Sequence, residues 1–185
     1  MANEKTEILK VGFILFAITA VAALVLAVVN NFTAPVITEN NKRAQEEALR
    51  LVLHDAPGFE LVEFTPSEGS SVKEVYNAGG IGTVVKVSPA GYGGKIDMVV
   101  GIDNNLKVTG IEIISQSETA GLGSNCTNDS FKAKFIGKTE NITVVKNGAK
   151  GNEIDAISSA TVTSKAVTKG VNDAISAVKT MKGGK

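Results

Sequence analysis

Residues 96–114 read IDMVVGIDNNLKVTGIEII, and this stretch decides the fold. Its two halves, residues 96–102 and 108–114, are short runs rich in β-branched side chains, the pattern of β-strands. Between them lies Asp103-Asn104-Asn105, whose residue types tolerate the left-handed backbone of a tight turn. A β-hairpin is therefore expected here, and it gives the domain a sheet with an antiparallel centre.

Further runs of β-branched residues lie on both sides of this hairpin, at residues 72–76, 83–87 and 142–145, and predict three more strands. Close to the C-terminus, apolar residues recur at helical spacing and predict an amphipathic helix over roughly residues 163–181. These residues are Val167, Val171, Ala174, Ile175 and Val178. The predicted class is α+β, with one mixed, mostly antiparallel sheet and flanking helices.

The N-terminal part of the chain has a different character, because residues 11–29 carry no charge and are apolar apart from Gly12 and Thr19. A helix of this length spans about 28 Å at ~1.5 Å per residue, close to the ~30 Å hydrocarbon layer of a bilayer. Val25-Leu26-Ala27 has the small residues of a signal-peptide cleavage site, but the apolar region of such a peptide usually covers only about 7–15 residues. We therefore expect residues 1–30 to contain a retained transmembrane helix in contact with the lipid bilayer.

Basic residues flank this helix at unequal distances. Lys5 and Lys10 lie near its N-terminal end, whereas Lys42, Arg43 and Arg50 lie farther from its other end. Positive charge close to a membrane span favours the cytoplasmic side. The pattern favours a single pass with a cytoplasmic N-terminus and a domain outside the cytoplasm.

A break is expected at Thr33-Ala34-Pro35, and the polar segment that follows it has apolar residues on one helical face. That face contains Ala44, Ala48, Leu49, Val52 and Leu53. It predicts a linking helix within residues 31–60 that ends near Ala56-Pro57-Gly58. One domain is expected to follow over residues 61–185.

The composition argues against several classes of function. Nineteen basic and nineteen acidic residues balance, so the positive surface that binds nucleic acid is not expected. With one cysteine, Cys126, and one histidine, His54, neither an internal disulfide nor a metal-binding cluster is expected. The glycine-rich segments lack the patterns of nucleotide hydrolases and dinucleotide-binding folds, and no Ser/His/Asp triad is expected. We therefore predict no catalytic residues of these kinds.

Three segments rich in glycine or hydroxyl side chains interrupt the strands and helices: GYGG at 91–94, SETAGLGS at 117–124 and DAISSATVTS at 155–164. Taken alone, such glycines indicate tight turns, and a Ser/Thr cluster before an apolar periodic run indicates a helix cap. The third segment also places several hydroxyls in the turn that opens the last helix. Free N–H groups and the helix dipole make that turn suitable for a phosphate.

In combination, these segments resemble the FMN-binding domain family, in particular the G subunit of the Rnf electron-transport complex. The C subunit of the sodium-pumping NADH:quinone reductase is a more distant resemblance. The shared features cover nearly the whole chain: the N-terminal anchor, the Gly-Tyr-Gly-Gly turn, a strand ending in Val100-Gly101-Ile102-Asp103, the Glu-Thr-x-Gly-Leu-Gly loop and the final hydroxyl motif.

The resemblance implies one FMN that a dedicated flavin transferase joins through its phosphate to Thr161. In the family motif, Asp-x-x-Ser/Thr-Gly-Ala-Thr, the last Thr receives the phosphate, and Asp155, Ser158, Ala160 and Thr161 match it. Ser159 stands where the family usually has Gly. The motif continues through Thr163 and Ser164.

The same resemblance assigns a cofactor-binding set and no metal. Its members are Ser158, Ser159, Ala160, Thr161, Thr163 and Ser164 around the phosphate, and Glu118, Thr119, Gly121, Leu122, Gly123 and Tyr92 around the ring. The hydroxyls of Thr163 and Ser164 are expected to receive the phosphate, and Lys165 to add positive charge. The glycines of residues 91–94 are expected to leave space for the flavin. Asp155 is expected to be read by the transferase.

What the resemblance implies for function is an electron-carrying subunit of an ion-translocating ferredoxin:NAD oxidoreductase in a bacterial cell membrane. The subunit would work with the other membrane and iron–sulfur subunits of that complex and have no turnover of its own. Two alternatives stay open. The chain could be the FMN subunit of a sodium-pumping NADH:quinone reductase, although that relative is usually longer. It could also be a membrane-tethered assembly subunit without cofactor, whose Ser/Thr motif is only a helix cap.

Overall fold

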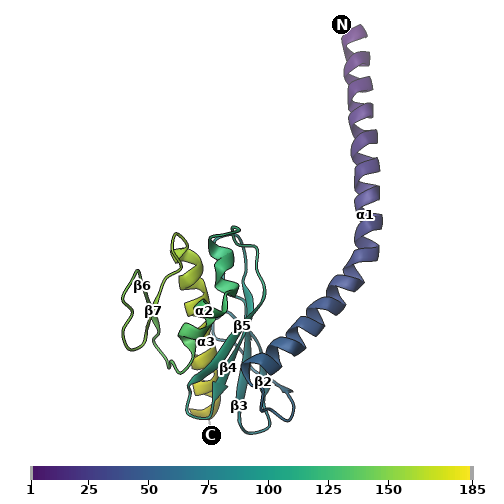
Figure 1. Cartoon of the computed structure of the whole chain (residues 1–185). Coiled ribbons are helices and arrows are strands. Elements are labelled where there is room, and N and C mark those ends of the chain that lie inside the picture. Colours follow the sequence, from purple (N-terminus) through teal and green to yellow (C-terminus); the bar gives the residue numbers. More distant parts are fainter. Residues whose placement is uncertain (1, 184–185) are drawn as a thin grey trace. The chain divides into compact units, whose positions relative to one another are not determined.

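The computed structural model describes residues 2–183, with side chains from residue 7 onward (Figure 1). Its elements are α1 (Ala2–Val52), β1 (Glu60–Val62), β2 (Val72–Asn77), β3 (Gly82–Val87), β4 (Asp97–Asp103), β5 (Val108–Ser115), η1 (Gly123–Thr127), α2 (Asp129–Lys132), η2 (Ala133–Phe135), β6 (Thr143–Val145), β7 (Glu153–Asp155) and α3 (Thr161–Gly183). The chain forms two compact units, Met1–Arg43 and Ala44–Lys185, and the second contains the sheet.

Helix α1 contains the predicted membrane segment, and in the described part of the chain it is the one helix long and apolar enough to cross a membrane. Its large apolar side chains are exposed, Phe13 to 72% and Leu24 to 66%, which suits a lipid-facing helix. The predicted break at Thr33-Ala34-Pro35 is wrong, because α1 continues through Pro35 to Val52. Ending the helix there would leave additional backbone groups unpaired, and beside a bilayer that costs more than the one bond that proline removes.

Strands β1 to β5 form one antiparallel sheet in sequential order. The predicted hairpin is confirmed as β4 and β5. The left-handed residue of its turn is Leu106, with φ 61°, and not one of the asparagines. Asp103 stabilises this turn, because its Oδ1 accepts hydrogen bonds from the backbone N–H groups of Asn105 at 2.8 Å and Lys107 at 2.9 Å.

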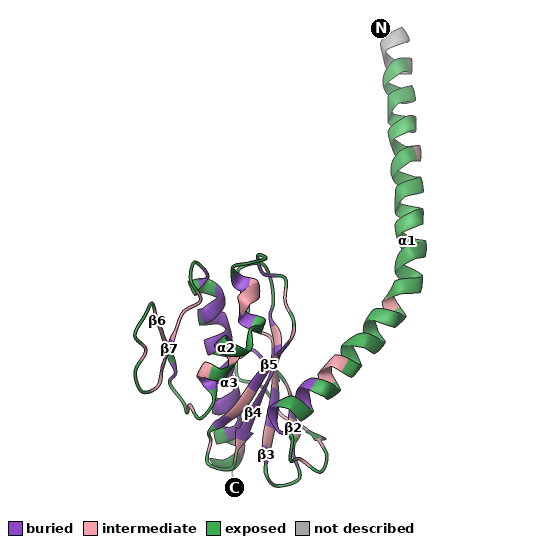
Figure 2. Cartoon of the chain, in the orientation of Figure 1, coloured by how far each residue is buried: buried purple, intermediate pink, exposed green. Residues whose placement is uncertain are grey.

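Helix α3 covers one face of the sheet and forms the larger core with it. The residues predicted to line the buried face of α3 are all buried, and much of the α3 ribbon is purple in Figure 2. From the sheet, alternate residues of β4 join this core, namely Met98, Val100 and Ile102. The predicted C-terminal helix is therefore confirmed, and it begins at Thr161.

The other face of the sheet is covered by the last turns of α1. Leu49 and Val52 of α1 belong to a second cluster of buried residues, with Val84 of β3 and Val99 of β4. Both faces of β3 and β4 are therefore buried. This explains why their sequences are nearly continuous apolar runs and do not alternate.

The end of α1 lies so close to the sheet that the strand residue facing it, Gly101, has no space for a side chain. Gly101 of β4 is paired with Gly110 of β5. A β-carbon on Gly101 would lie 2.5 Å from the carbonyl oxygen of Val52. The Thr109 hydroxyl donates a hydrogen bond to the same oxygen at 2.6 Å, satisfying one of the carbonyls left free at a helix end.

The region between the sheet and α3 is less regular than the sequence indicated. The strand predicted at 142–145 is confirmed as β6, but it pairs in parallel with β7, which sequence analysis did not predict. Before it, Phe131 and Phe135 pack edge to face with their ring centroids 5.5 Å apart and are buried in the larger core. The chain therefore has the predicted α+β class, with an additional small parallel pair.

Candidate functional site

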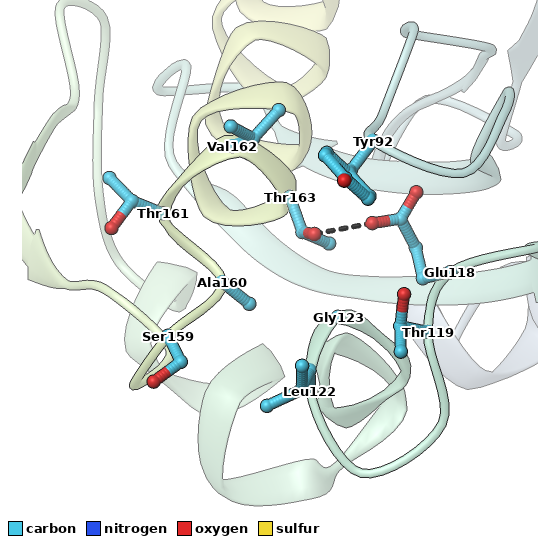
Figure 3. Close-up of a pocket in the computed structure, with 10 residues that line it drawn as sticks. All are labelled: Tyr92, Glu118, Thr119, Leu122, Gly123, Ser159, Ala160, Thr161, Val162 and Thr163. Atoms are coloured by element: carbon cyan, nitrogen blue, oxygen red, sulfur yellow. Dashed lines mark hydrogen bonds between the residues drawn. The ribbon is translucent and has the colours of Figure 1, made fainter.

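A cavity of about 520 Å³ lies where the first turn of α3 meets the loops that contain Tyr92 and Glu118 (Figure 3). Its lining residues are Tyr92, Glu118, Thr119, Leu122, Gly123, Ser159, Ala160, Thr161, Val162 and Thr163. Its size is within the ~300–1,000 Å³ of small-molecule sites. All the predicted cofactor-binding residues line it except Ser158, Ser164 and Gly121. Val162 is an addition that sequence analysis did not name, although it lies inside the matched motif.

Thr161 is the first residue of α3, and its side chain is exposed at the cavity. The chain enters the helix through Ser159, whose φ of 59° is in the left-handed region that favours glycine. This backbone conformation gives a physical reason for the Gly in the family motif. Ala160, between the two, is buried, and its carbonyl accepts a hydrogen bond from the N–H of Ser164 at 3.0 Å.

The hydroxyls that follow Thr161 are turned inward. Ser164 is fully buried, and its Oγ donates to the carbonyl of Ala160 at 3.0 Å and accepts from the N–H of Ile157 at 2.9 Å. The Thr163 hydroxyl donates to a carboxylate oxygen of Glu118 (Figure 3). Both hydroxyls therefore hold the turn that presents Thr161, where sequence analysis expected them to receive a phosphate.

Glu118 joins the three segments that sequence analysis singled out. Its side chain lies in the loop after β5, and the residue is only 8% exposed. One carboxylate oxygen, Oε1, accepts from the backbone N–H of Gly93 at 2.9 Å, and the other accepts from Thr163. The residue thus ties the 91–94 turn and the 117–124 loop to the start of α3.

The glycines around Glu118 make room for its carboxylate. A β-carbon on Gly91 would lie 2.4 Å from Oε1, and one on Gly123 would lie 2.6 Å from Oε2. Of the turn 91–94, Tyr92 alone lines the cavity. The space beside Gly91 is thus occupied by Glu118, and the backbone of Ser117 lies beside Gly93. That these glycines leave space for a flavin stays a prediction.

The rest of the 117–124 loop is a compact turn. The carbonyl of Thr119 accepts hydrogen bonds from the N–H groups of Leu122 at 3.1 Å and Ser124 at 3.2 Å. Gly121, with φ 74°, supplies the left-handed residue of this turn and lies away from the cavity. The turn leaves the Leu122 side chain 42% exposed at the cavity, where an apolar ligand surface can contact it.

Asp155, Lys165 and Cys126 lie outside the cavity lining. The Asp155 carboxylate accepts from the N–H of Ala149 at 2.9 Å and so holds the connection between β6 and β7. Lys165 is exposed on the first turns of α3. Burial, together with the nearby charge of Glu118, raises the pKa of the Cys126 thiol to about 11, which keeps it protonated and unreactive at neutral pH.

The geometry suits an anionic cofactor with an aromatic ring system. An exposed hydroxyl stands at the N-terminal end of a helix of 23 residues, where backbone N–H groups favour phosphate. Around the same cavity the side chains of Tyr92, Leu122 and Val162 are exposed to 74%, 42% and 54%. They supply the apolar contact surface that a flat ring needs. The residues present therefore fit FMN.

Comparison with known protein families gives two matches that together cover most of the chain. Residues 91–176 match the FMN-binding domain, and residues 1–52 match the RnfG N-terminal region. The first match contains the whole cavity lining, and the second coincides with α1.

Curated relatives and solved structures agree with these matches. The chain is 37% identical, over 89% of its length and 88% of the relative's, to the G subunit of the proton-translocating ferredoxin:NAD⁺ oxidoreductase complex of Clostridium ljungdahlii. It is 39% identical, over 94% and 95%, to the G subunit of the Na⁺-translocating ferredoxin:NAD⁺ oxidoreductase complex of Acetobacterium woodii. In fold it is similar to the C subunit of the Na⁺-translocating NADH-quinone reductase of Parabacteroides distasonis, with a TM-score of 0.56 at 22% identity over 75% of this chain and 90% of that one.

Proposed function

This chain belongs to the family of G subunits of Rnf-type ion-translocating ferredoxin:NAD oxidoreductase complexes, and on that premise we propose that it is the electron-carrying subunit of such a complex, with one FMN bound covalently to Thr161. The observation that carries the proposal is the position of Thr161. It is exposed at the first residue of α3, in the wall of a cavity that lies within the FMN-binding domain match.

Each part of the site has a task in this function. Bound FMN supplies reversible uptake and release of electrons. The Thr161 hydroxyl provides the oxygen for the phosphate ester, and the N–H groups at the start of α3 stabilise the phosphate charge. Lys165 adds positive charge on the same turns of the helix. Tyr92, Leu122 and Val162 contact the ring and exclude water from it.

The buried hydroxyls and Glu118 keep this arrangement rigid. Ser164 and Thr163 fix the turn before and after Thr161, and Glu118 fastens the two loops to it. A rigid binding site suits an electron carrier, because it keeps the cofactor at a constant distance from the next carrier. A covalent tether also prevents loss of the cofactor from a domain outside the cytoplasm, where it could not be replaced.

The same membership implies a membrane location and partners. We place α1 across a bacterial cell membrane, with the FMN domain outside the cytoplasm, and the other membrane and iron–sulfur subunits of the Rnf complex beside it. A flavin transferase is required to form the ester. The two relatives are named for different ions, proton and sodium, although this chain resembles both about equally.

The test is the intact mass of the denatured full chain, purified from cells that also express the flavin transferase. We expect the mass of FMN minus water, located by peptide mapping on the peptide that contains Thr161. Thr161→Ala should abolish the addition completely, because the ester oxygen is lost while the exposed position leaves the fold unchanged. Ser176→Ala removes an exposed hydroxyl farther along α3, outside both the motif and the cavity lining, and should keep full loading.

Unmodified wild-type chain in the presence of an active transferase would contradict the proposal and favour the cofactor-free assembly subunit. Loading that persists in Thr161→Ala would place the ester on another residue. The quinone-reductase alternative has weaker support, since its likeness at 22% identity shows the fold alone, whereas the Rnf relatives match along nearly the whole chain.

A further inference from the structure

Glu118 is a carboxylate in the cavity wall without a cation to balance it. The residue is 8% exposed and lines the cavity. Among the side chains of residues 7–183, the ion pairs within 4.0 Å join other residues, and none of them includes Glu118. Its carboxylate is held by one backbone N–H and one hydroxyl, both neutral donors.

The surrounding backbone is built for this carboxylate. Gly91 and Gly123 lie close to its two oxygens, at positions where a β-carbon would approach them to 2.4 Å and 2.6 Å. The Gly93 N–H and the Thr163 hydroxyl each donate to one oxygen. A buried carboxylate held only by neutral donors is an expensive arrangement, because its water has been removed and no opposite charge replaces it. A purely structural contact between two loops and a helix would not require a charge.

We propose that Glu118 is a positioning residue that also acts as a fixed negative charge, lowering the reduction potential of the flavin held in the cavity. This inference rests on the proposed function and adds the residue that tunes it. Reduction brings electrons into the cavity, and a negative charge in the wall opposes them. In a protein interior with an effective dielectric constant of about 20, a unit charge a few ångströms away is enough to change an equilibrium constant more than tenfold.

Glu118→Gln removes the negative charge of the side chain and keeps its size and shape. Glutamine has the same size, its oxygen can accept from Gly93, and its amide can donate to the Thr163 oxygen. The matched control is Glu140→Gln, which also removes one negative charge. Glu140 pairs with Lys179, eighteen residues beyond Thr161 on α3. That distance is about 27 Å along the helix and exceeds the ~8–10 Å over which surface charges act at ordinary salt.

The experiment is a redox titration of the FMN-loaded full chain in detergent, followed by flavin absorbance at neutral pH. For Glu118→Gln we expect the equilibrium constant for reduction to rise at least tenfold. This is an upward shift of about 30 mV for a two-electron couple. Glu140→Gln should titrate like the wild type. Equal FMN loading in all three chains, measured by mass, shows that the shift does not come from a damaged site.

A Glu118→Gln chain that is fully loaded and titrates like the wild type overturns the inference while leaving the proposed function intact. A wild-type chain without FMN overturns both. If the variant does not load, the ¹³C signal of the Glu118 carboxyl in loaded wild-type chain decides the matter. A carboxylate signal at pH 7 supports the fixed charge, and a protonated carboxyl at pH 7 overturns it.

Discussion

Ser159, two residues before the proposed attachment residue Thr161, has a strained backbone conformation. A side chain in the left-handed region costs about 1 kcal/mol relative to glycine, because its β-carbon crowds the following carbonyl. Ser159 has φ 59° and is exposed, so no packing depends on its hydroxymethyl group. The strain is local and is confined to the entry into α3.

Ser159→Gly should therefore stabilise the domain by about 0.5–1 kcal/mol and leave the FMN loading of Thr161 unchanged or higher. Thermal unfolding of the full chain in detergent measures the first effect, and intact mass the second. Ser158→Gly is the control. Ser158 is exposed in the same segment but is not among the residues with positive φ, so glycine should not stabilise it. A lower melting temperature for Ser159→Gly would show that its hydroxyl has a structural partner.

Asp173 is a second residue whose chemistry can be tested directly. Burial raises the pKa of this carboxyl, but hydrogen bonds from Lys169 and Ser71 outweigh that effect and hold the pKa below its usual value near 3.8. Its Oδ2 accepts from the Ser71 N–H at 2.8 Å, the Ser71 hydroxyl at 2.6 Å and Lys169 Nζ at 2.6 Å. The contact joins α3 to the residue before β2.

Asp173→Asn should lower the free energy of unfolding by about 1–3 kcal/mol at pH 7, the usual effect of losing hydrogen bonds to a charged group. Because the folded-state pKa is depressed, this stabilisation is complete above about pH 4 and disappears as the pH falls through the lower, folded-state value. Melting temperatures of both chains from pH 7 to pH 3 should therefore converge at the acid end. A constant difference across this range would contradict the linkage. Asp129→Asn is the control: its side chain is 99% exposed, and its surface ion pair with Lys132 should contribute less than about 1 kcal/mol.

The motif residues of the site could be identified from the sequence, but their tasks could not. Resemblance indicated Glu118, Thr163 and Ser164 as contacts of the cofactor. Whether a hydroxyl points into a cavity or back into the protein depends on partners distant in sequence, and Glu118 and Thr163 are separated by 45 positions. Nothing local in the chain specifies that pairing. The sequence also indicated that Ser159 is unusual, because the family motif has Gly at this position. The positive φ of Ser159 explains why Gly is preferred there.

At the level of elements, the contact between the end of α1 and the sheet depends on one glycine. A β-carbon on Gly101 would lie 2.5 Å from the Val52 carbonyl oxygen and 2.4 Å from the Thr109 hydroxyl oxygen. Gly101→Ala should therefore destabilise the domain by about 1–3 kcal/mol, as overpacking of a tight contact usually does. Gly110→Ala is the control, because its β-carbon would meet Val52 at an ordinary 3.4 Å. Equal melting temperatures for the two variants would show that the helix end moves away without cost.

Elements whose pattern is long or strongly periodic were predictable. The hairpin of β4 and β5, the strands β2 and β3 and the helix α3 all follow from apolar periodicity and turn residues, since burial selects those residues directly. The break expected at Thr33-Ala34-Pro35 does not occur, because the helical runs on both sides of Pro35 override the effect of the proline. Strand β7 has three residues, too few to show any period, and its pairing with β6 is set by the surrounding fold.

At the level of the whole molecule, the membrane anchor and the cofactor-binding domain are separate parts of the chain. Residues in α1 up to Arg43 form a unit with exposed apolar side chains, and the unit from Ala44 onward contains the sheet, the cavity and Thr161. The anchor therefore determines on which side of the membrane electrons reach the flavin. Orientation is thus a functional property of the chain, and it depends on charges that flank α1.

Lys10 lies directly before the apolar segment, whereas Lys42 and Arg43 lie more than ten residues beyond it, so the positive-inside rule favours a cytoplasmic N-terminus. A C-terminal fusion of alkaline phosphatase, which is active only outside the cytoplasm, should be active, and a C-terminal fusion of green fluorescent protein exported by the same route should be dark. Substituting Lys5 and Lys10 by glutamine while adding two lysines directly after Val29 should lower phosphatase activity and raise fluorescence, since the bias is then reversed. A fluorescent fusion on the unaltered chain would place the cavity and Thr161 in the cytoplasm. FMN lost from the site could then be replaced, so a covalent bond would not be needed to retain the cofactor.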